Sequence, residues 1–355
     1  MLSKPNSGNT RWLICSVLVA LQLAACQPAP QEFSDRIAAF GTLITLRYYG
    51  VAEAEAAAAT RALEGYFRSI ENDWYPWGNG ELQRINEALA SGQSTPVSQP
   101  LANLLQRATD LERRSDGLFN PALGALSELW GFNDLLQDDW QPPAHAAIAE
   151  LLQHDPGSRH LHWSGHTLRS DNRYIVLDPG GIAKGAILAS SARILSELGI
   201  ANAIVDIGGD LIVRGYAGQR AARIGIRSPG SDSAIGWLEA APGEAIVTSG
   251  NYERYFEFDG IRYNHVLDPR TGYPVAASAS VTVAHADPVL ADAAATALLV
   301  AGPNGFDALC AALGIEQALL ITASGDLRLT PALQARVHWL DEDDARRDSG
   351  RDVSQ

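Results

Sequence analysis

The stretch "DPGGIAKGAIL", residues 178–188, links a predicted strand to a predicted helix. The strand-like run before it is "YIVL", residues 174–177, and a helical pattern covers residues 182–198. Lysine is rare in this chain: among 27 Lys and Arg residues, only Lys4 and Lys184 are lysines. A lysine near a helix N-terminus opposes the positive end of the helix dipole. Lys184 therefore has a reason to be there other than helix stability.

This stretch matches neither of two common phosphate-binding motifs. A Walker loop needs Gly-Lys-Ser/Thr, whereas the chain has Ala183-Lys184-Gly185. A dinucleotide fingerprint needs glycines at its first, third and sixth positions, whereas the glycines here are Gly180, Gly181 and Gly185. Small residues, a helix N-terminus and a cation still form a suitable phosphate site, because the backbone can approach the ligand closely. The alternative is a structural glycine turn beside an exposed lysine.

Composition narrows the class of protein. The 355 residues suffice for one large domain or two ordinary ones, and 46% of them are hydrophobic, which is enough for a sizeable core. The formal net charge of -14 excludes the basic footprint of a nucleic-acid-binding protein. An acidic protein that binds phosphates needs a local device, such as a helix N-terminus or a bound metal ion.

The N-terminus resembles a bacterial lipoprotein signal peptide over residues 1–25. A positively charged start precedes the apolar run "WLICSVLVALQLAA", which ends in "LAAC" at Cys26. Cys26 is the predicted lipidation site, residues 26–35 are a predicted tether, and the protein is expected on the periplasmic face of a bacterial membrane, held by its lipid anchor only. The alternative is a plain secretory signal with a cysteine by chance. Cys310, the one cysteine outside this region, is expected to be buried.

Helical patterns dominate the first half of the chain and strand patterns the second. Helices are predicted at 52–70, 100–114 and 121–137. Asp259-Gly260 predicts a hairpin turn between two aromatic-rich strands. This order favours an α+β fold in one domain, residues 36–340. The acidic tail, residues 341–355, has no apolar face and is predicted to be disordered.

A second candidate site is "DPVLADAAATALLV", residues 287–300. Asp287 is a good helix N-cap, with a proline in the first helical position after it. Asp292 and Thr296 are four residues apart, so both oxygens lie on one helix face. A carboxylate and a hydroxyl suit a hard cation such as Mg²⁺. Such a pair is also common on ordinary helix surfaces.

A third is "SGNYERYFEFDGIRYNHVLDPRTGYP", residues 249–274. His265 lies where a strand becomes a turn, a position from which a histidine can act as a general base. It could equally be a half-buried neighbour of the tyrosines. Asp268 and Arg270 belong to "DPRTG", in which turn chemistry explains both residues equally well.

Eight sequence blocks, taken together and in order, resemble the ApbE family of FAD:protein FMN transferases over residues 36–330. The blocks are "FGTLITL", "GELQRIN", "DGLFNPALGALSELWGF", "DPGGIAKG", "VDIGGDLIVRG", "IVTSGNYERYF", "NHVLDPRTGYPV" and "ADAAATAL". The resemblance implies an ApbE-like fold with mixed or antiparallel sheets packed against helices. It also implies an FAD cleft between the helical N-terminal part and the strand-rich C-terminal part.

The resemblance further implies a reaction. The family cleaves the pyrophosphate of FAD with Mg²⁺, attaches FMN to a threonine of a target protein through a phosphodiester, and releases AMP. The expected acceptor is a flavoprotein subunit of a membrane electron-transfer complex, of the Na⁺-translocating NADH:quinone reductase or a related type. Two alternatives remain open: a periplasmic FAD pyrophosphatase, in which water replaces the threonine, and a lipoprotein that only binds flavin.

The family's functional positions can be carried over to this chain. The metal ligands would be Asp292, Thr296 and the backbone carbonyl of Gly181, and His265 and Lys184 would serve catalysis, with Asp268 acting through water as an alternative base. The FAD contacts would be Phe40, Leu118, Phe119, Asn120, Asp178, Lys184 and Val266.

Two of these positions depart from the family, which often has aspartate at Asn120 and methionine at Phe40. Asparagine keeps an acceptor but loses the charge, so a contact to FAD is retained more readily than a metal or base role. Lys184 and Asp292 are expected near the surface of the cleft. Their replacement should therefore leave the stability of the ligand-free protein almost unchanged.

Replacing Cys26 tests the predicted lipid anchor. Cys26→Ser removes the thiol that would carry the lipid, so the variant should appear as soluble protein or as an unprocessed precursor. Membrane and soluble fractions of expressing cells, compared by immunoblot, measure this. A variant that fractionates with the membrane as the wild type does would contradict the assignment.

Overall fold

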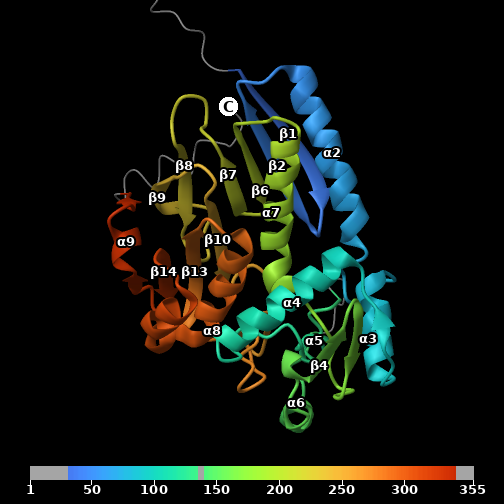
Figure 1. Ribbon diagram of the computed structural model, residues 1–355. Helices are drawn as coiled ribbons and strands as arrows, with labels where there is room; N and C mark the ends of the chain where they lie inside the picture. The colour runs from blue at the N-terminus through green and yellow to red at the C-terminus, as the bar shows by residue number, and fades with distance from the viewer. Residues whose placement is uncertain (1–30, 135–139, 341–355) are drawn as a thin grey trace, which may run out of the picture.

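An eight-stranded antiparallel sheet forms the centre of the protein (Figure 1). The structure is a computed structural model and describes residues 31–134 and 140–340, so the predicted signal peptide, Cys26 and the tail lie outside the described residues. The strands follow one another across the sheet as β1 (Glu32–Ala39), β2 (Thr42–Tyr49), β6 (Ala203–Ile207), β7 (Asp210–Arg214), β10 (Ala245–Gly250), β13 (Ser278–His285), β14 (Ala318–Thr322) and β15 (Leu327–Leu329).

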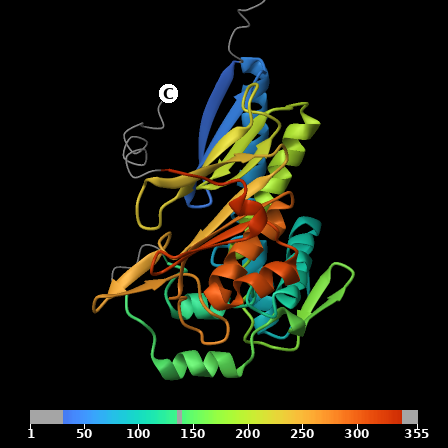
Figure 2. The same ribbon diagram turned by 90° about the vertical axis from the view of Figure 1, so that its left-hand side faces the viewer.

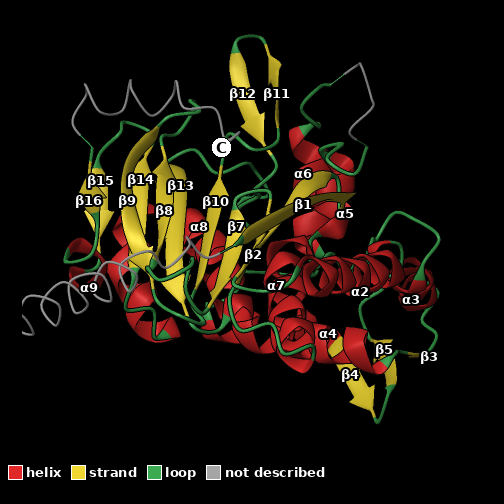
Figure 3. Cartoon of the chain, turned by 90° about the horizontal axis from the view of Figure 1, so that it is seen from above, coloured by secondary structure: helices red, strands yellow, loops and turns green. Residues whose placement is uncertain are grey.

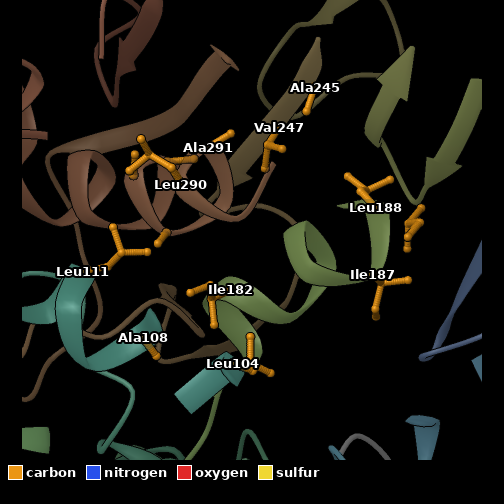
Figure 4. Close-up of a cluster of buried hydrophobic side chains, with 14 of the residues drawn as sticks. Leu104, Ala108, Leu111, Ile182, Ile187, Leu188, Ala245, Val247, Leu290 and Ala291 are labelled. Carbon is orange, nitrogen blue, oxygen red and sulfur yellow. The ribbon is translucent and has the colours of Figure 1, made fainter. Parts of the chain in front are cut away.

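Helices cover one face of this sheet, as Figure 3 shows from above. They are α2 (Glu53–Glu71), α7 (Gly180–Glu197) and α8 (Pro288–Leu313), with α4 (Gln99–Arg114) packed against α7 and α8. Figure 4 shows side chains of α4, α7, α8 and β10 meeting in the core between these elements. The smaller helices are α3 (Glu81–Ala90), α5 (Gly124–Leu129), α6 (His145–Gln153), the 3₁₀ turn η1 (Ser158–His160) and α9 (Pro331–Gln334).

The other face of the sheet carries a second apolar core. The small sheet of β16 (His338–Trp339), β9 (Ala234–Ala240) and β8 (Ala222–Arg227) contributes to it. Burial on both faces is clear in β14, where Leu320 packs into the helical core while Leu319 and Ile321 pack into the second core. Successive side chains of a strand point to opposite faces. This is why the central strands are apolar throughout rather than alternating.

Two hairpins lie outside these layers. One is β4 (Leu161–Ser164) with β5 (Thr167–Ser170), which also pairs with β3 (Thr95–Pro96). The other is β11 (Tyr255–Phe258) with β12 (Ile261–Asn264), a sheet of two strands that projects from the body in Figure 3. Figure 2 shows α6 at the end of the molecule opposite the start of β1.

The α+β class predicted from the sequence is confirmed, as are α2, α4 and the hairpin turn at Asp259-Gly260. Asp287 caps α8 as expected, accepting the backbone N–H groups of Val289 and Leu290. By length and composition, α8 is the one helix in the described ranges that could cross a membrane. Instead it packs in the helical core, and it bends at Gly302, whose φ is 66°. Cys310 on this helix is buried, as predicted.

Three local predictions were wrong. Within the described part of the helix expected at 121–137, up to residue 134, the structure has α5 alone, because residues at its start pair with another segment: the N–H of Gly124 donates to the Val176 carbonyl. The strand expected at 174–177 is reduced to one isolated parallel bridge, between Val176 and Leu123. β1 begins at Glu32, inside the predicted tether, because residues 32–39 pair in full register with β2.

The helices α7 and α8 lie very close together at Gly185. A methyl group there would lie 2.3 Å from the carbonyl oxygen of Pro288, which is backbone and cannot move aside alone. Gly185→Ala should therefore reduce the free energy of unfolding by about 1–3 kcal/mol, the usual cost of overpacking. Urea unfolding would measure it.

Gly65→Ala is the matched control, since Gly65 lies inside α2 and a methyl group there meets nothing within 4 Å. Because alanine has a higher helix propensity than glycine, this substitution should stabilise the protein by up to about 1 kcal/mol. Equal unfolding midpoints for the two variants would refute the close contact.

Candidate active site

The three predicted metal ligands meet where the start of α7 faces α8. Gly185 of α7 donates its N–H to Oδ2 of Asp292 at 2.7 Å. A methyl group on Gly181 would lie 3.2 Å from Oγ1 of Thr296, which also lies 3.2 Å from the hydroxyl of Ser249 on β10. The structure therefore brings Gly181, Asp292 and Thr296 together, and adds Ser249, which sequence reasoning missed.

Gly181 is a glycine because of its neighbours. A side chain there would press on Thr296 and on the ring of Phe119, each 3.2 Å from the added carbon. In a regular helix the N–H of Gly185 would donate to the Gly181 carbonyl. Here that N–H is bonded to Asp292. A carbonyl oxygen has two lone pairs, so the Gly181 carbonyl can accept a hydrogen bond through one and still bind a cation through the other.

Asp292 is buried, with 2% of its surface exposed. The expectation that it lies near the surface was wrong, because α7 and α8 approach each other closely beside it. Burial and the charge of Asp210 raise the pKa of Asp292 to about 7, although Lys184 and the Gly185 N–H oppose the rise. A carboxylate held in this way is stabilised by a nearby cation.

The oxygen donors of this site fit Mg²⁺. A carboxylate, a hydroxyl and a backbone carbonyl are hard ligands, and Mg²⁺ usually binds through one or two carboxylates plus substrate phosphates and water. Within residues 31–134 and 140–340, no three His, Cys, Asp or Glu side chains are grouped so that they could hold a metal ion. The described residues therefore suit a shared site completed by a phosphate rather than an all-protein cage.

Lys184 forms an ion pair with Asp210, the first residue of β7. The Asp210 side chain is 2% exposed and that of Lys184 is 38% exposed. Burial lowers the pKa of Lys184, but Asp210 and Asp292 raise it more, so the net pKa lies above its ordinary value and the ammonium stays charged.

This pairing argues against the expectation that Lys184 contributes little to stability without ligand, because its partner carboxylate is buried. Removal of one partner would leave a buried charge uncompensated, which destabilises a protein strongly. Sequence reasoning missed Asp210, although an aspartate opening the apolar strand "DLIV" needs a partner, and Lys184 is the only lysine in the described residues.

His265 is fixed in one tautomer by the backbone. The backbone nitrogen of His265 lies 3.1 Å from the carbonyl oxygen of Arg254, and the ring atom Nδ1 lies 3.2 Å from the same oxygen. A carbonyl can only accept, so Nδ1 carries the proton and Nε2 keeps its lone pair. Burial and the charge of Arg254 lower the pKa of His265 to about 4. The ring is therefore neutral near pH 7 and can accept a proton at Nε2.

The turn after His265 is held by an ion pair. Nε and one terminal nitrogen of Arg270 bind the two carboxylate oxygens of Asp268 at 2.9 and 2.7 Å. Arg270 also donates to the carbonyl of Val300 at 3.3 Å, which ties the turn to α8. Both oxygens of Asp268 are engaged, which favours its turn role over a role as base.

The predicted FAD contacts other than Lys184 fall into three groups. Asp178 and Phe119 lie at the start of α7: Oδ1 of Asp178 accepts the Gly180 N–H at 2.9 Å, and burial raises the pKa of Asp178. Asn120 instead joins its own loop to the segment after α6, since it donates to the Pro156 carbonyl at 2.9 Å and accepts the Ala122 N–H at 2.8 Å. The remaining residues pack against the helical core and stay predicted contacts: Phe40, Leu118 and Val266.

Comparisons with known proteins agree with this geometry. The model of the ApbE family matches residues 40–320. The FAD:protein FMN transferase of Rhodobacter capsulatus is 42% identical over 313 residues, which are 87% of this chain and 59% of that protein. That of Treponema pallidum is 31% identical, over 93% and 95% of the two chains.

Solved structures give the same result. The ApbE protein of Thermotoga maritima matches with a TM-score of 0.79 and 28% identity, over 86% of this chain and 99% of that one. The flavin transferase ApbE of Vibrio cholerae matches with a TM-score of 0.76 and 26% identity, over 86% and 99% of the chains.

Binding of a divalent cation should depend on the ionisation of Asp292. Its pKa is about 7 when folded and 3.8 ordinarily, so this group's contribution to the free energy of unfolding should fall as pH rises from about 4 through 7. A cation binds only the carboxylate, so the gain in melting temperature on adding Mg²⁺ should be larger at pH 8 than at pH 6.

Asp292→Asn should lose this gain at both pH values, whereas Asp326→Asn, an exposed carboxylate at the β14–β15 turn, should keep it. The same Mg²⁺ gain in Asp292→Asn and wild type would remove Asp292 from the metal site.

Proposed function

The chain belongs to the ApbE family, and on that premise we propose that it is a Mg²⁺-dependent flavin transferase, which moves FMN from FAD to a protein threonine and releases AMP. The observation that carries the proposal is the meeting of Gly181, Asp292 and Thr296 beside the charged ammonium of Lys184. Hard oxygen ligands next to a fixed cation form a site for a metal-bound diphosphate.

The base of the reaction lies in the same electrostatic environment. Burial, then the charge of Arg254 and to a lesser extent that of Lys184, lower the pKa of His265. Burial raises the pKa of Asp178, and the charge of Arg254 opposes that rise. Residues at the start of α7 are thus coupled to the segment between β10 and β12. Neutral His265 with a free Nε2 is the form that a general base requires.

Each residue then has a defined task. Gly181, Asp292 and Thr296 would hold Mg²⁺, which when bound neutralises charge on the diphosphate and polarises the phosphorus–oxygen bonds. Lys184 adds a second positive charge on the diphosphate. His265 accepts the proton of the threonine hydroxyl as its oxygen attacks the phosphorus of the FMN half. The bond to the AMP phosphate oxygen breaks, so FMN is attached through a phosphodiester and AMP leaves.

The acceptor and the location belong to the same proposal. A lipidated Cys26 would hold the enzyme on the periplasmic face of the membrane. An acceptor there would be a flavoprotein subunit of a membrane electron-transfer complex, of the Na⁺-translocating NADH:quinone reductase or a related type. The name shared by the relatives from Rhodobacter and Treponema supports a protein acceptor.

Incubation of the protein with FAD, Mg²⁺ and a candidate acceptor subunit tests the function. The acceptor band should become fluorescent in a denaturing gel while AMP is released in equal amount. His265→Ala should reduce the rate by about 10²- to 10⁴-fold, the usual contribution of a general base. His338→Gln, at an exposed histidine stacked on Trp237, should not change it.

The two alternatives give different results in the same assay. Release of FMN and AMP without labelled acceptor would identify a pyrophosphatase. Binding of FAD with neither product would identify a flavin-binding protein. Either result with a confirmed acceptor would refute the transferase.

A further inference from the structure

Asp210 is a buried carboxylate that the steps above do not use. It follows the glycine turn Gly208-Gly209, whose φ angles are 62° and 98°. The N–H of Gly209 donates to Asp206 at 2.8 Å, which closes the turn. A side chain at Gly208 would come within 2.5 Å of the hydroxyl of Thr42 on β2, so the turn is also packed tightly. The backbone therefore fixes the place of Asp210 closely.

The two oxygens of Asp210 have separate partners. Oδ1 accepts the N–H of Thr248 on the neighbouring strand β10, at 2.8 Å. Oδ2 pairs with the ammonium of Lys184. A carboxylate bound on one side by a sheet and on the other by Lys184 is rigid, whereas the lysine stem has four rotatable carbons. The ammonium is thus held in place by Asp210.

Lys184 has a competing partner. Asp292, the carboxylate of the metal site, also attracts its ammonium, although less than Asp210 does. If the ammonium moved to Asp292 it would occupy the ligand that Mg²⁺ needs. Where Asp210 holds it, two of its three N–H donors remain for other acceptors.

Resting on the function proposed above, we infer that Asp210 is a positioning residue, which holds Lys184 ready for the FAD diphosphate and keeps it away from Asp292. The charges support this arrangement. With Asp292 ionised, the side chains of Asp210, Asp292 and Lys184 carry a net negative charge, which attracts a divalent cation. Once that cation is bound, the group is positive and attracts the diphosphate. By holding Lys184, Asp210 thereby favours both the binding of the metal ion and the binding of the substrate.

Asp210→Asn tests the inference with little change of shape. The amide oxygen can still accept the Thr248 N–H, but the ammonium loses its counter-charge. The dissociation constant for Mg²⁺, measured by titration without FAD, should rise at least tenfold because Lys184 moves to Asp292. The dissociation constant for FAD with saturating Mg²⁺, measured by quenching of flavin fluorescence, should also rise at least tenfold. Asp206→Asn is the matched control, since it removes a charge from the same hairpin, and both constants should change less than threefold.

A double variant separates positioning from simple stability. Lys184→Met alone leaves the buried carboxylate of Asp210 without a counter-charge, so the melting temperature of the ligand-free protein should fall. In Lys184→Met with Asp210→Asn, the melting temperature should recover and so should the affinity for Mg²⁺, because no ammonium competes for Asp292. The affinity of this double variant for FAD should remain at least tenfold weaker than that of the wild type. If Asp210 and Lys184 only stabilised the fold, removing Lys184 from the Asp210→Asn variant would not restore its affinity for Mg²⁺.

The outcomes distinguish this inference from the proposed function. Equal Mg²⁺ affinity in Asp210→Asn and in the double variant, or wild-type affinities for both ligands in Asp210→Asn, would overturn the role of Asp210 alone. A wild-type protein that binds neither FAD nor Mg²⁺ would overturn the proposed function, and the inference with it.

Discussion

The approach of α7 to α8 at Gly185 is the contact on which the site depends. With no side chain at Gly185, the two helices come close enough for its N–H to reach Asp292. That bond places Thr296, one turn further along α8, opposite Gly181. A bulkier residue would separate the helices and with them the oxygen donors of the proposed metal site. Apolar side chains next to this contact, Ile187 and Leu188 of α7 and Ala291 of α8, lie in the helical core and support the geometry of the site (Figure 4).

Electrostatic balance sets the second constraint. Buried carboxylates are stable only with partners. Asp210 has Lys184 and a strand N–H, whereas Asp292 has N–H groups, a more distant ammonium and a raised pKa. The two aspartates thus differ in readiness for a cation: Asp210 is already paired, and Asp292 gains most from one. This difference, rather than the presence of acidic residues, is the reason why Asp210 is paired with the lysine and Asp292 is proposed as the metal ligand.

The double-sided sheet explains how such a site stays rigid. β7 and β10, which present Asp210, Thr248 and Ser249, are held between the helical core and the second core. Their ends therefore have little freedom, and the side chains at them keep their distances. His265 is outside this frame, at the base of the β11–β12 hairpin, and depends on the carbonyl of Arg254 for its orientation.

The sequence alone determined the fold class, the helices α2 and α4, the cap at Asp287 and the shared helix face of Asp292 and Thr296. These features depend on spacing within one element, and spacing is visible in a sequence. Only the tertiary structure decided that Asp292 is buried, because its partner Gly185 lies 107 positions away. The same holds for the pairing of Lys184 with Asp210 and for the shortened helix α5, whose first residues bond to a distant segment. Local sequence patterns specify which face of an element is apolar. Contacts between residues far apart in the sequence decide what packs against that face, and these contacts set the charge and reactivity of each residue.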